Sequence, residues 1–159
     1  MNTFQIHIKP FQSHHQADID NLMTTLAEEF TDNIFSPQSK TITEVSLLST
    51  DKYWVAYTND IVVGTIGFSE LKDNNIVLKR MFLSKEFRGQ GVAKMLLDKL
   101  INFAIDNNVS NIYLGTMTQF KAAQKFYEKN NFTKIPQTVL PIDFTINPVD
   151  TIFYRRELN

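Results

Sequence analysis

The chain has 159 residues, of which 43% are hydrophobic and 21% charged, which suits a single globular domain over residues 1–159 and excludes a disordered chain. Its 16 basic and 17 acidic residues give a formal net charge of −1, which argues against a broad nucleic-acid-binding surface. Cysteine is absent, so disulfides, thiolate metal sites and a cysteine nucleophile are excluded.

The first expected elements are a strand and a helix. Residues Phe4–Ile8 alternate as in a short strand, which we expect Pro10 to end. Apolar residues then recur at helical spacing, so a helix is predicted over about His14–Phe30, with Ser13 and Gln16 as its capping box. Its apolar face consists of Ile19, Leu22, Met23, Leu26, Ala27 and Phe30.

A meander of three strands is predicted next. Residues 31–50 contain a loop with proline and a short helix or strand, between which periodicity does not decide. Residues Tyr53–Leu71 are rich in aromatic and β-branched side chains and are interrupted by Thr58-Asn59-Asp60, a pattern typical of a hairpin. After a polar turn at Lys72–Asn75, Ile76–Leu83 forms the third strand.

The second half of the chain predicts a crossover. A glycine-rich turn after Leu83 leads into a helix from Val92, and a strand, NIYLGT, begins at Asn111. Strand, helix and strand joined in this way place the two strands parallel. A helix over about Thr118–Asn130 and a last strand in VDTIFYRREL follow. This order predicts an α+β fold with a mixed, mostly antiparallel sheet and helices on both of its faces.

The turn RGQGVAK, Arg88–Lys94, has the features of an anion site. Backbone N–H groups at a helix start lack intrahelical partners, and the helix dipole adds positive charge there. Gly89 and Gly91 allow close backbone approach, while Arg88 and Lys94 add charge. The alternative is a solvated loop. A dinucleotide site is disfavoured because Lys94 stands where its third glycine belongs, and a Walker A loop is excluded because no Gly-Lys pair occurs.

Two motifs resemble the GNAT superfamily of N-acetyltransferases, over about Ile76–Phe132. The family pattern is a strand followed by R/Q-x-x-G-x-G/A opening a helix, and Arg88, Gly91 and Ala93 fill it. FYEKNNF, which ends at Phe132, is similar to the family's helix signature around a tyrosine. The motifs occur in the family's order, separated by a helix and a strand, and the two together are more specific than either alone.

The resemblance implies acetyl-coenzyme A as donor, no metal, and a primary amine on a small molecule or a peptide as acceptor. By it, the N–H groups of the turn bind the pyrophosphate, and the end of the preceding strand pairs with the pantetheine arm like an added strand. The implied cofactor-binding residues are Met81, Phe82, Leu83, Arg88, Gly89, Gln90, Gly91, Val92, Ala93 and Lys94.

The resemblance also implies one catalytic residue. The family tyrosine lies near the thioester sulfur, so Tyr127 is expected to protonate the leaving thiolate. Val77 stands where many members carry a glutamate base, and Phe120 stands where many carry an asparagine. The general base therefore stays open. Candidate carboxylates are Glu28, Glu29, Asp32 and Glu70.

The expected function is N-acetyl transfer by direct amine attack in a ternary complex. The alternative is a coenzyme A-binding sensor module without turnover, which the valine at position 77 makes plausible. The start of the chain has no signal-peptide core, and no run of about 18 apolar residues occurs, so we expect a cytoplasmic protein with no membrane partner. A homodimer is possible.

Overall fold

The computed structural model describes residues 5–28 and 51–158. The described α-helices are α1 (Gln16–Ala27), α3 (Val92–Asp106) and α4 (Lys121–Lys129), and short 3₁₀ helices lie at Ser13–His15, Lys85–Phe87 and Gln137–Val139. The described strands are β1 (His7–Pro10), β2 (Asp51–Thr58), β3 (Ile61–Leu71), β4 (Asn75–Leu83), β5 (Asn111–Thr116), β6 (Thr133–Ile135) and β7 (Ile152–Glu157).

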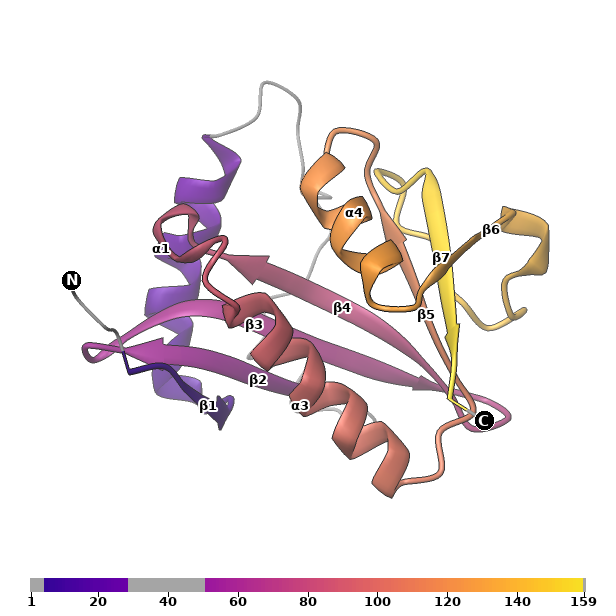
Figure 1. Cartoon of the computed structure of the whole chain (residues 1–159), viewed down its shortest axis with the longest axis horizontal. Coiled ribbons are helices and arrows are strands. Elements are labelled where there is room, and N and C mark those ends of the chain that lie inside the picture. The colour runs from indigo at the N-terminus through magenta and orange to yellow at the C-terminus, as the bar shows by residue number, and fades with distance from the viewer. Residues whose placement is uncertain (1–4, 29–50, 159) are drawn as a thin grey trace.

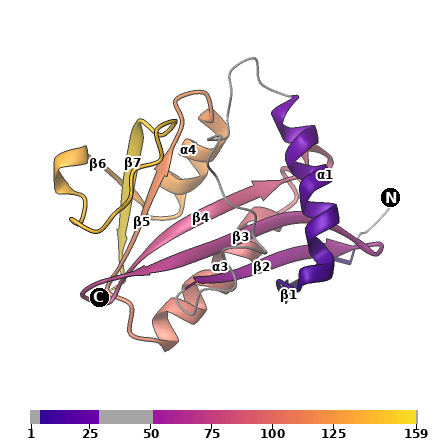
Figure 2. The same cartoon turned by 180° about the vertical axis from the view of Figure 1, so that it is seen from behind.

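These strands form one sheet in the order β1-β2-β3-β4-β5-β7-β6. Among the described strands, β4 and β5 form the one parallel pair, and the other neighbours are antiparallel. Helices α3 and α4 cover one face of the sheet, and α1 covers the opposite face (Figures 1 and 2). We call these the α3 face and the α1 face. The predicted α+β class, the mixed sheet and the parallel crossover are confirmed.

The two faces are distinguished by alternate residues of the central strands. Ile112 and Leu114 of β5 belong to the main core, together with the buried side chains of α3. Tyr113, between them, packs with Val77 and Phe153 in a separate cluster on the other side. Side chains of successive strand residues point to opposite faces. Even-numbered positions of β5 therefore lie on the α3 face, and odd-numbered positions lie on the α1 face.

Strands β4 and β5 separate towards their carboxyl ends. They pair only from Asn75↔Asn111 to Val77↔Tyr113. Beyond that point β4 stays on β3 as far as Leu83, and β5 stays on β7 as far as Thr116. The divergence is visible in Figure 1. We call this opening between the ends of β4 and β5 the fork.

Strand β4 contains a β-bulge beside the fork. The register with β3 shifts between Thr65↔Phe82 and Gly67↔Lys79, so that Arg80 and Met81 stand against one residue of β3. Arg80 has φ +55°, and its carbonyl oxygen accepts a hydrogen bond of 2.6 Å from the Thr65 hydroxyl. A bulge of this kind bends the strand and re-aims the residues after it.

The amino-terminal elements differ in detail from the expectation. The first strand ends at Pro10, as predicted, and Pro10 is itself part of the strand, paired with Trp54. Proline is tolerated there because β1 is an edge strand. The predicted capping box at Ser13 was wrong: Ser13 opens a 3₁₀ turn, and the backbone N–H of Gln12 donates to His15 Nδ1 at 3.0 Å. Phe4 and residues 29–50, with the undecided element, lie outside the described residues.

The carboxyl-terminal part holds two further differences. Helix α4 begins at Lys121 and not at Thr118, because Phe120 is its non-helical cap and the Gln124 amide donates to the oxygens of Met117 and Thr118 (3.1 and 3.0 Å). Strand β6, three residues long, was not predicted. It forms because the segment pairs with β7 from Thr133↔Arg155 onward.

Candidate active site

The turn between β4 and α3 needs both of its glycines. Gly89 has φ +75° and Gly91 has φ +84°, backbone conformations that side-chain-bearing residues adopt at a cost. A Cβ atom at either position would meet no heavy atom of the described residues within 4 Å beyond its chain neighbours. The glycines are therefore required by the backbone and not by packing, and the space beside them is open.

This open space lies at the amino end of a fifteen-residue helix. Gly91 is the cap of α3, and the N–H of Met95 is the first to reach back to the Gly91 oxygen, at 3.1 Å. The N–H groups of Val92, Ala93 and Lys94 precede that bond and have no carbonyl within the helix. Dipoles and left-handed glycines together fit a phosphate group. The residues present therefore fit the pyrophosphate that the motif implies.

The polar side chains of the turn bond within the protein. The Arg88 guanidinium donates to the Leu83 oxygen, Gln90 Nε2 donates to the Glu86 oxygen at 2.9 Å, and Lys94 pairs with Asp98 at 3.0 Å. The pair of Lys94 is exposed and costs little to break, so this lysine can turn to an anion. The guanidinium of Arg88 instead fastens the turn to the end of β4.

A third glycine, which the sequence analysis did not single out, brings β3, β4 and α3 together. A Cβ at Gly64 would lie 3.0 Å from the Phe82 oxygen and 3.1 Å from the side chains of Leu83 and Leu96. The N–H of Ser84 continues this contact by donating to the Val63 oxygen at 2.8 Å. A lone glycine inside a strand signals such a close approach. Gly64 thus sets the position of α3 relative to the end of β4.

The predicted pantetheine-binding segment lies along one side of the fork. Met81 and Leu83 pack against the core of the α3 face, and Phe82 packs with side chains of α1 on the other face. The backbone of Phe82 pairs with Thr65 of β3. Because β5 pairs with β4 no further than Val77, β5 does not cover the opposite backbone edge of this segment.

Tyr127 of α4 lies in the main core on the α3 face. Its ring is buried against Phe126, Phe132 and Tyr154, with centroid separations of 5.9, 5.6 and 5.9 Å. Burial, with a smaller contribution from the charge of Asp150, holds the pKa of its phenol well above the ordinary value. The phenol therefore stays protonated at neutral pH, as a proton donor must.

The Tyr127 hydroxyl is positioned without being bonded. Within the described ranges it has no hydrogen-bond partner, and in the same ranges no fully buried side-chain oxygen or nitrogen lacks one. The hydroxyl oxygen is therefore not completely buried. Tyr154 of β7 holds α4 in place, since its hydroxyl donates to Glu128 at 2.6 Å; burial and this bond raise the pKa of Tyr154 to about 12.

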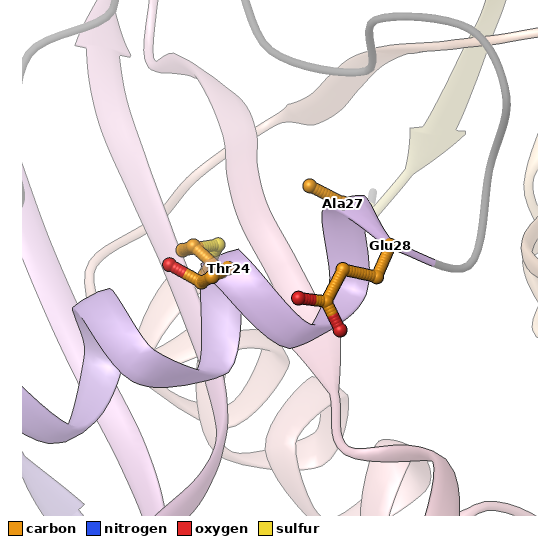
Figure 3. A pocket seen from close by; sticks show the side chains of 4 residues that line it. Thr24, Ala27 and Glu28 are labelled. Carbon is orange, nitrogen blue, oxygen red and sulfur yellow. The ribbon is translucent and has the colours of Figure 1, made fainter.

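The described carboxylates among the candidate bases lie at the end of α1 and at the end of β3 that pairs with the start of β4. Val77 is buried in an apolar cluster at the closed end of the fork. Glu70 is exposed and pairs with Ile76, at the end of β4 away from the turn. Glu28 is exposed at the end of α1, where it lines an open depression with Met23, Thr24 and Ala27 (Figure 3). Glu29 and Asp32 lie outside the described residues.

One carboxylate that sequence reasoning missed lies at the fork. Asp150 Oδ2 is 2.9 Å from the place that a Cβ would take at Gly115 of β5. Burial raises the pKa of Asp150 to about 6. No motif marks this residue, because its contact joins two positions 35 apart in the sequence.

Two kinds of feature are absent from the described residues: a metal-binding cluster and a membrane-spanning helix. In residues 5–28 and 51–158, no group of three or more His, Asp or Glu could hold a metal ion. None of the described helices is long and apolar enough to cross a membrane.

Comparison with known proteins gives a family match and close structural neighbours. The model of the acetyltransferase (GNAT) family matches residues 19–132. N-acetylaspartate synthetase from Danio rerio is 37% identical over 107 residues, which are 65% of this chain and 38% of that protein; the Homo sapiens protein is 35% identical over the same length. The chain thus spans less than two fifths of the curated relatives named here.

The solved structures agree over nearly the whole chain. An acetyltransferase of the GNAT family from Staphylococcus aureus Mu50 matches with a TM-score of 0.90 at 31% identity, covering 98% of this chain and 100% of that one. The PaiA N-acetyltransferase from Thermoplasma acidophilum, solved in complex with coenzyme A, shares the fold with a TM-score of 0.76 at 16% identity, over 96% and 99% of the two chains.

Proposed function

The chain belongs to the acetyltransferase (GNAT) family, and we propose that it transfers the acetyl group of acetyl-coenzyme A to a primary amine by direct attack in a ternary complex. The comparisons support acetyl-CoA-dependent N-acetyl transfer with coenzyme A as co-substrate. One observation carries the proposal for this chain: the open, glycine-lined start of α3 lies directly after the strand end that borders the fork.

The binding roles follow the order of these elements. The N–H groups of the turn from Arg88 to Lys94 hold the pyrophosphate, and Lys94 adds its charge once it leaves Asp98. The backbone of Met81–Leu83 pairs with the amide groups of the pantetheine arm on the edge that β5 leaves uncovered. The acetyl group then lies within the fork.

Tyr127 supplies the proton for the leaving group. Its phenol is protonated and unbonded among the described residues, and it approaches from the α3 face. When the thioester C–S bond breaks, the hydroxyl proton passes to the sulfur, and the phenol regains a proton from solvent. The observation that supports this role is a largely buried tyrosine whose hydroxyl makes no hydrogen bond within the described ranges.

A small amine that carries a carboxylate is the acceptor class we propose first. The relatives at 37% and 35% identity are named N-acetylaspartate synthetases. In this chain two basic residues, Lys79 and Arg80, follow at the point where β4 leaves β5. L-aspartate is therefore the first acceptor to test. The cytoplasmic location, the single domain over residues 1–159 and a homodimer stay predictions from the sequence.

A thiol-release assay tests the proposal. Because the chain contains no cysteine, a thiol reagent reports only the coenzyme A that is set free. We expect release from acetyl-coenzyme A that depends on L-aspartate or on another amine of a panel of amino acids and polyamines. Tight binding of coenzyme A with no release for any amine would favour the sensor module, which the comparisons do not favour.

A further inference from the structure

We propose that Asp150 accepts the proton of the incoming amine, on the α1 face of the fork, opposite Tyr127. The inference rests on the proposed acetyl transfer and supplies the base that is missing at Val77. Asp150 lies in the loop that precedes β7.

The loop is hydrogen-bonded to the end of β5 and to the segment just after it. The N–H of Thr151 donates to the Thr116 oxygen at 3.0 Å, and the hydroxyls of Thr151 and Thr118 lie 2.9 Å apart. The N–H of Asp150 itself donates to the Asn147 oxygen at 2.9 Å, which closes a turn. Asp150 is therefore held against β5 by its own backbone and by its neighbour.

Gly115 provides the space for the carboxylate. A Cβ at position 115 would lie 2.9 Å from Asp150 Oδ2, 3.2 Å from Asp150 Cβ and 3.1 Å from the Phe153 ring. Position 115 has the same parity as Tyr113, so this contact lies on the α1 face. It also lies two residues past the last pair between β4 and β5, which places the carboxylate at the open part of the fork.

Asp150 adjoins an apolar cluster along the chain. Its chain neighbour Val149 packs against a cluster that spans the fork from α1 to both strand ends, made of Leu22, Leu26, Met117, Met23, Phe82 and Phe120. No hydrogen bond or ion pair to the Asp150 carboxylate is present within the described ranges. The group is partly buried and free to take up a proton, and burial raises its pKa to about 6.

Among the described residues, the charged groups of β4 at the fork are Lys79 and Arg80, and Lys79 has the parity of Val77, which places it on the α1 face. The other groups around Asp150 lie on α4, β5, β7 and α1. Tyr127 of α4 interacts with its charge from the other face of the sheet. On the α1 face, Tyr113 of β5 and Arg155 of β7 pair with each other two positions nearer the closed end, and Arg155 is bonded to Glu157 at 3.3 Å. Glu28 ends α1, beside the same apolar cluster.

The ammonium group of the acceptor gives one proton to the Asp150 carboxylate, and the neutral amine forms a bond to the thioester carbonyl carbon. The C–S bond breaks, the sulfur takes the proton of Tyr127, and the nitrogen loses its second proton to water as the amide forms. Asp150 and Tyr127 return to their starting states through solvent, so that one proton is released per acetyl group transferred.

The test uses three single variants of the whole chain and the amine that the thiol-release screen identifies, starting with L-aspartate. Asp150→Asn removes the base and nearly keeps its shape. Asp143→Asn is the matched control, because this carboxylate lies in the same loop but accepts a hydrogen bond from the Lys72 N–H at 2.8 Å. Gly115→Ala keeps the carboxylate but forces it to move.

We expect kcat/KM of the wild type to fall as the pH drops below about 6. At pH 7, Asp150→Asn should lower kcat/KM by about 100-fold, at the low end for a general base, and should lose that acid limb. Gly115→Ala should lower it less and keep the limb, and Asp143→Asn should match the wild type. The melting-temperature rise with coenzyme A should be the same in all four proteins.

The possible failures are distinguishable. Equal kcat/KM and equal pH profiles for Asp150→Asn and Asp143→Asn, with acetyl transfer intact, would overturn the role of Asp150 alone. A wild-type protein that binds coenzyme A and acetylates no amine at any pH would overturn the proposed function and the base together. An equal loss in Asp150→Asn and Asp143→Asn would assign the effect to the loop and also overturn the base.

Discussion

The Arg88 guanidinium donates two hydrogen bonds to the main-chain oxygen of Leu83, at 3.2 Å from Nε and 3.1 Å from Nη2. The arginine of the turn thus holds the last residue of β4. Its planar group can make both bonds at once, which a lysine cannot. The residue that the family motif presents as a charge for the cofactor also fixes the distance between the turn and the fork.

Arg88→Lys tests which of these roles matters. If Arg88 acts by fastening the turn, the lysine variant should bind coenzyme A about as weakly as Arg88→Ala. In both variants Kd should rise by roughly 10-fold, which corresponds to a loss of about 1.4 kcal/mol of binding free energy. Isothermal titration of coenzyme A into both variants provides the measurement. Recovery of wild-type affinity in Arg88→Lys would mean that positive charge alone is needed.

Gly91→Asp tests the assignment of the turn as the pyrophosphate site. In the wild type, coenzyme A at about 100 times its Kd should stabilise the fold by roughly 2.7 kcal/mol, which thermal unfolding detects. Aspartate at position 91 introduces a negative charge and a side chain at φ +84°, so this stabilisation should vanish. Gly91→Ala is the control, because it carries the backbone strain without the charge. An undiminished stabilisation in folded Gly91→Asp would remove the turn from the site.

Tyr127→Phe tests the proton donor. The change removes only the hydroxyl, so kcat should fall by about 10²-fold while the affinity for coenzyme A stays nearly unchanged. Tyr154→Phe is the matched control, since it removes the bond to Glu128 from the neighbouring ring and leaves Tyr127 intact. Steady-state kinetics at saturating acetyl-coenzyme A compare the two. A Tyr127→Phe enzyme with undiminished kcat for acetyl transfer would take the tyrosine out of the chemistry.

The titration of Asp150 should also appear in the stability of the fold. Its pKa is about 6 in the folded chain, above the value near 3.9 of an unfolded aspartate, so the folded state holds more protons between these values. The contribution of Asp150 to the free energy of unfolding should therefore fall as pH rises from about 4 to 6.

Asp150→Asn makes this contribution measurable. The variant should be more stable than the wild type above pH 6 and equal to it below pH 4. Because the side chain is only partly buried, we expect a gain of about 1 kcal/mol, or roughly 2–4 °C in Tm. Thermal melts of both proteins from pH 4 to 8 provide the comparison. A difference in Tm that does not change with pH would contradict the raised pKa.

The sheet and its helices could be predicted wherever short-range patterns carry the information. The aromatic and β-branched run of β2 and β3 predicted the hairpin, and its turn residues Asn59 and Asp60 adopt φ +48° and +63°, which such residues tolerate. The polar turn before β4 does the same at Asp73 and Asn74, with φ +61° and +60°. In these segments the turn residues and the alternation of apolar residues indicate the same structure, so local sequence was sufficient to predict it.

The candidate site was predictable only in its local part. Gly89 and Gly91 stood out because the left-handed backbone of the turn demands them. The fork, by contrast, depends on where β4 and β5 stop pairing, and the bulge uses Arg80, a residue type that gives no turn signal. The contact of Asp150 with Gly115 joins segments that no sequence pattern links, because it exists only once β7 has paired with β5.

The most direct test of the account is to identify both products of one incubation by mass spectrometry. Wild-type protein is mixed with acetyl-coenzyme A and L-aspartate, or with the amine that the screen identifies. The amounts of N-acetylated amine and free coenzyme A are then measured, and the mass of the protein is determined in the same sample. The account predicts the two products in equal amounts, no acetyl group on the protein, and loss of both products in Gly91→Asp. Coenzyme A formed without acetylated amine, or an acetylated protein accumulating when the amine is left out, would contradict it.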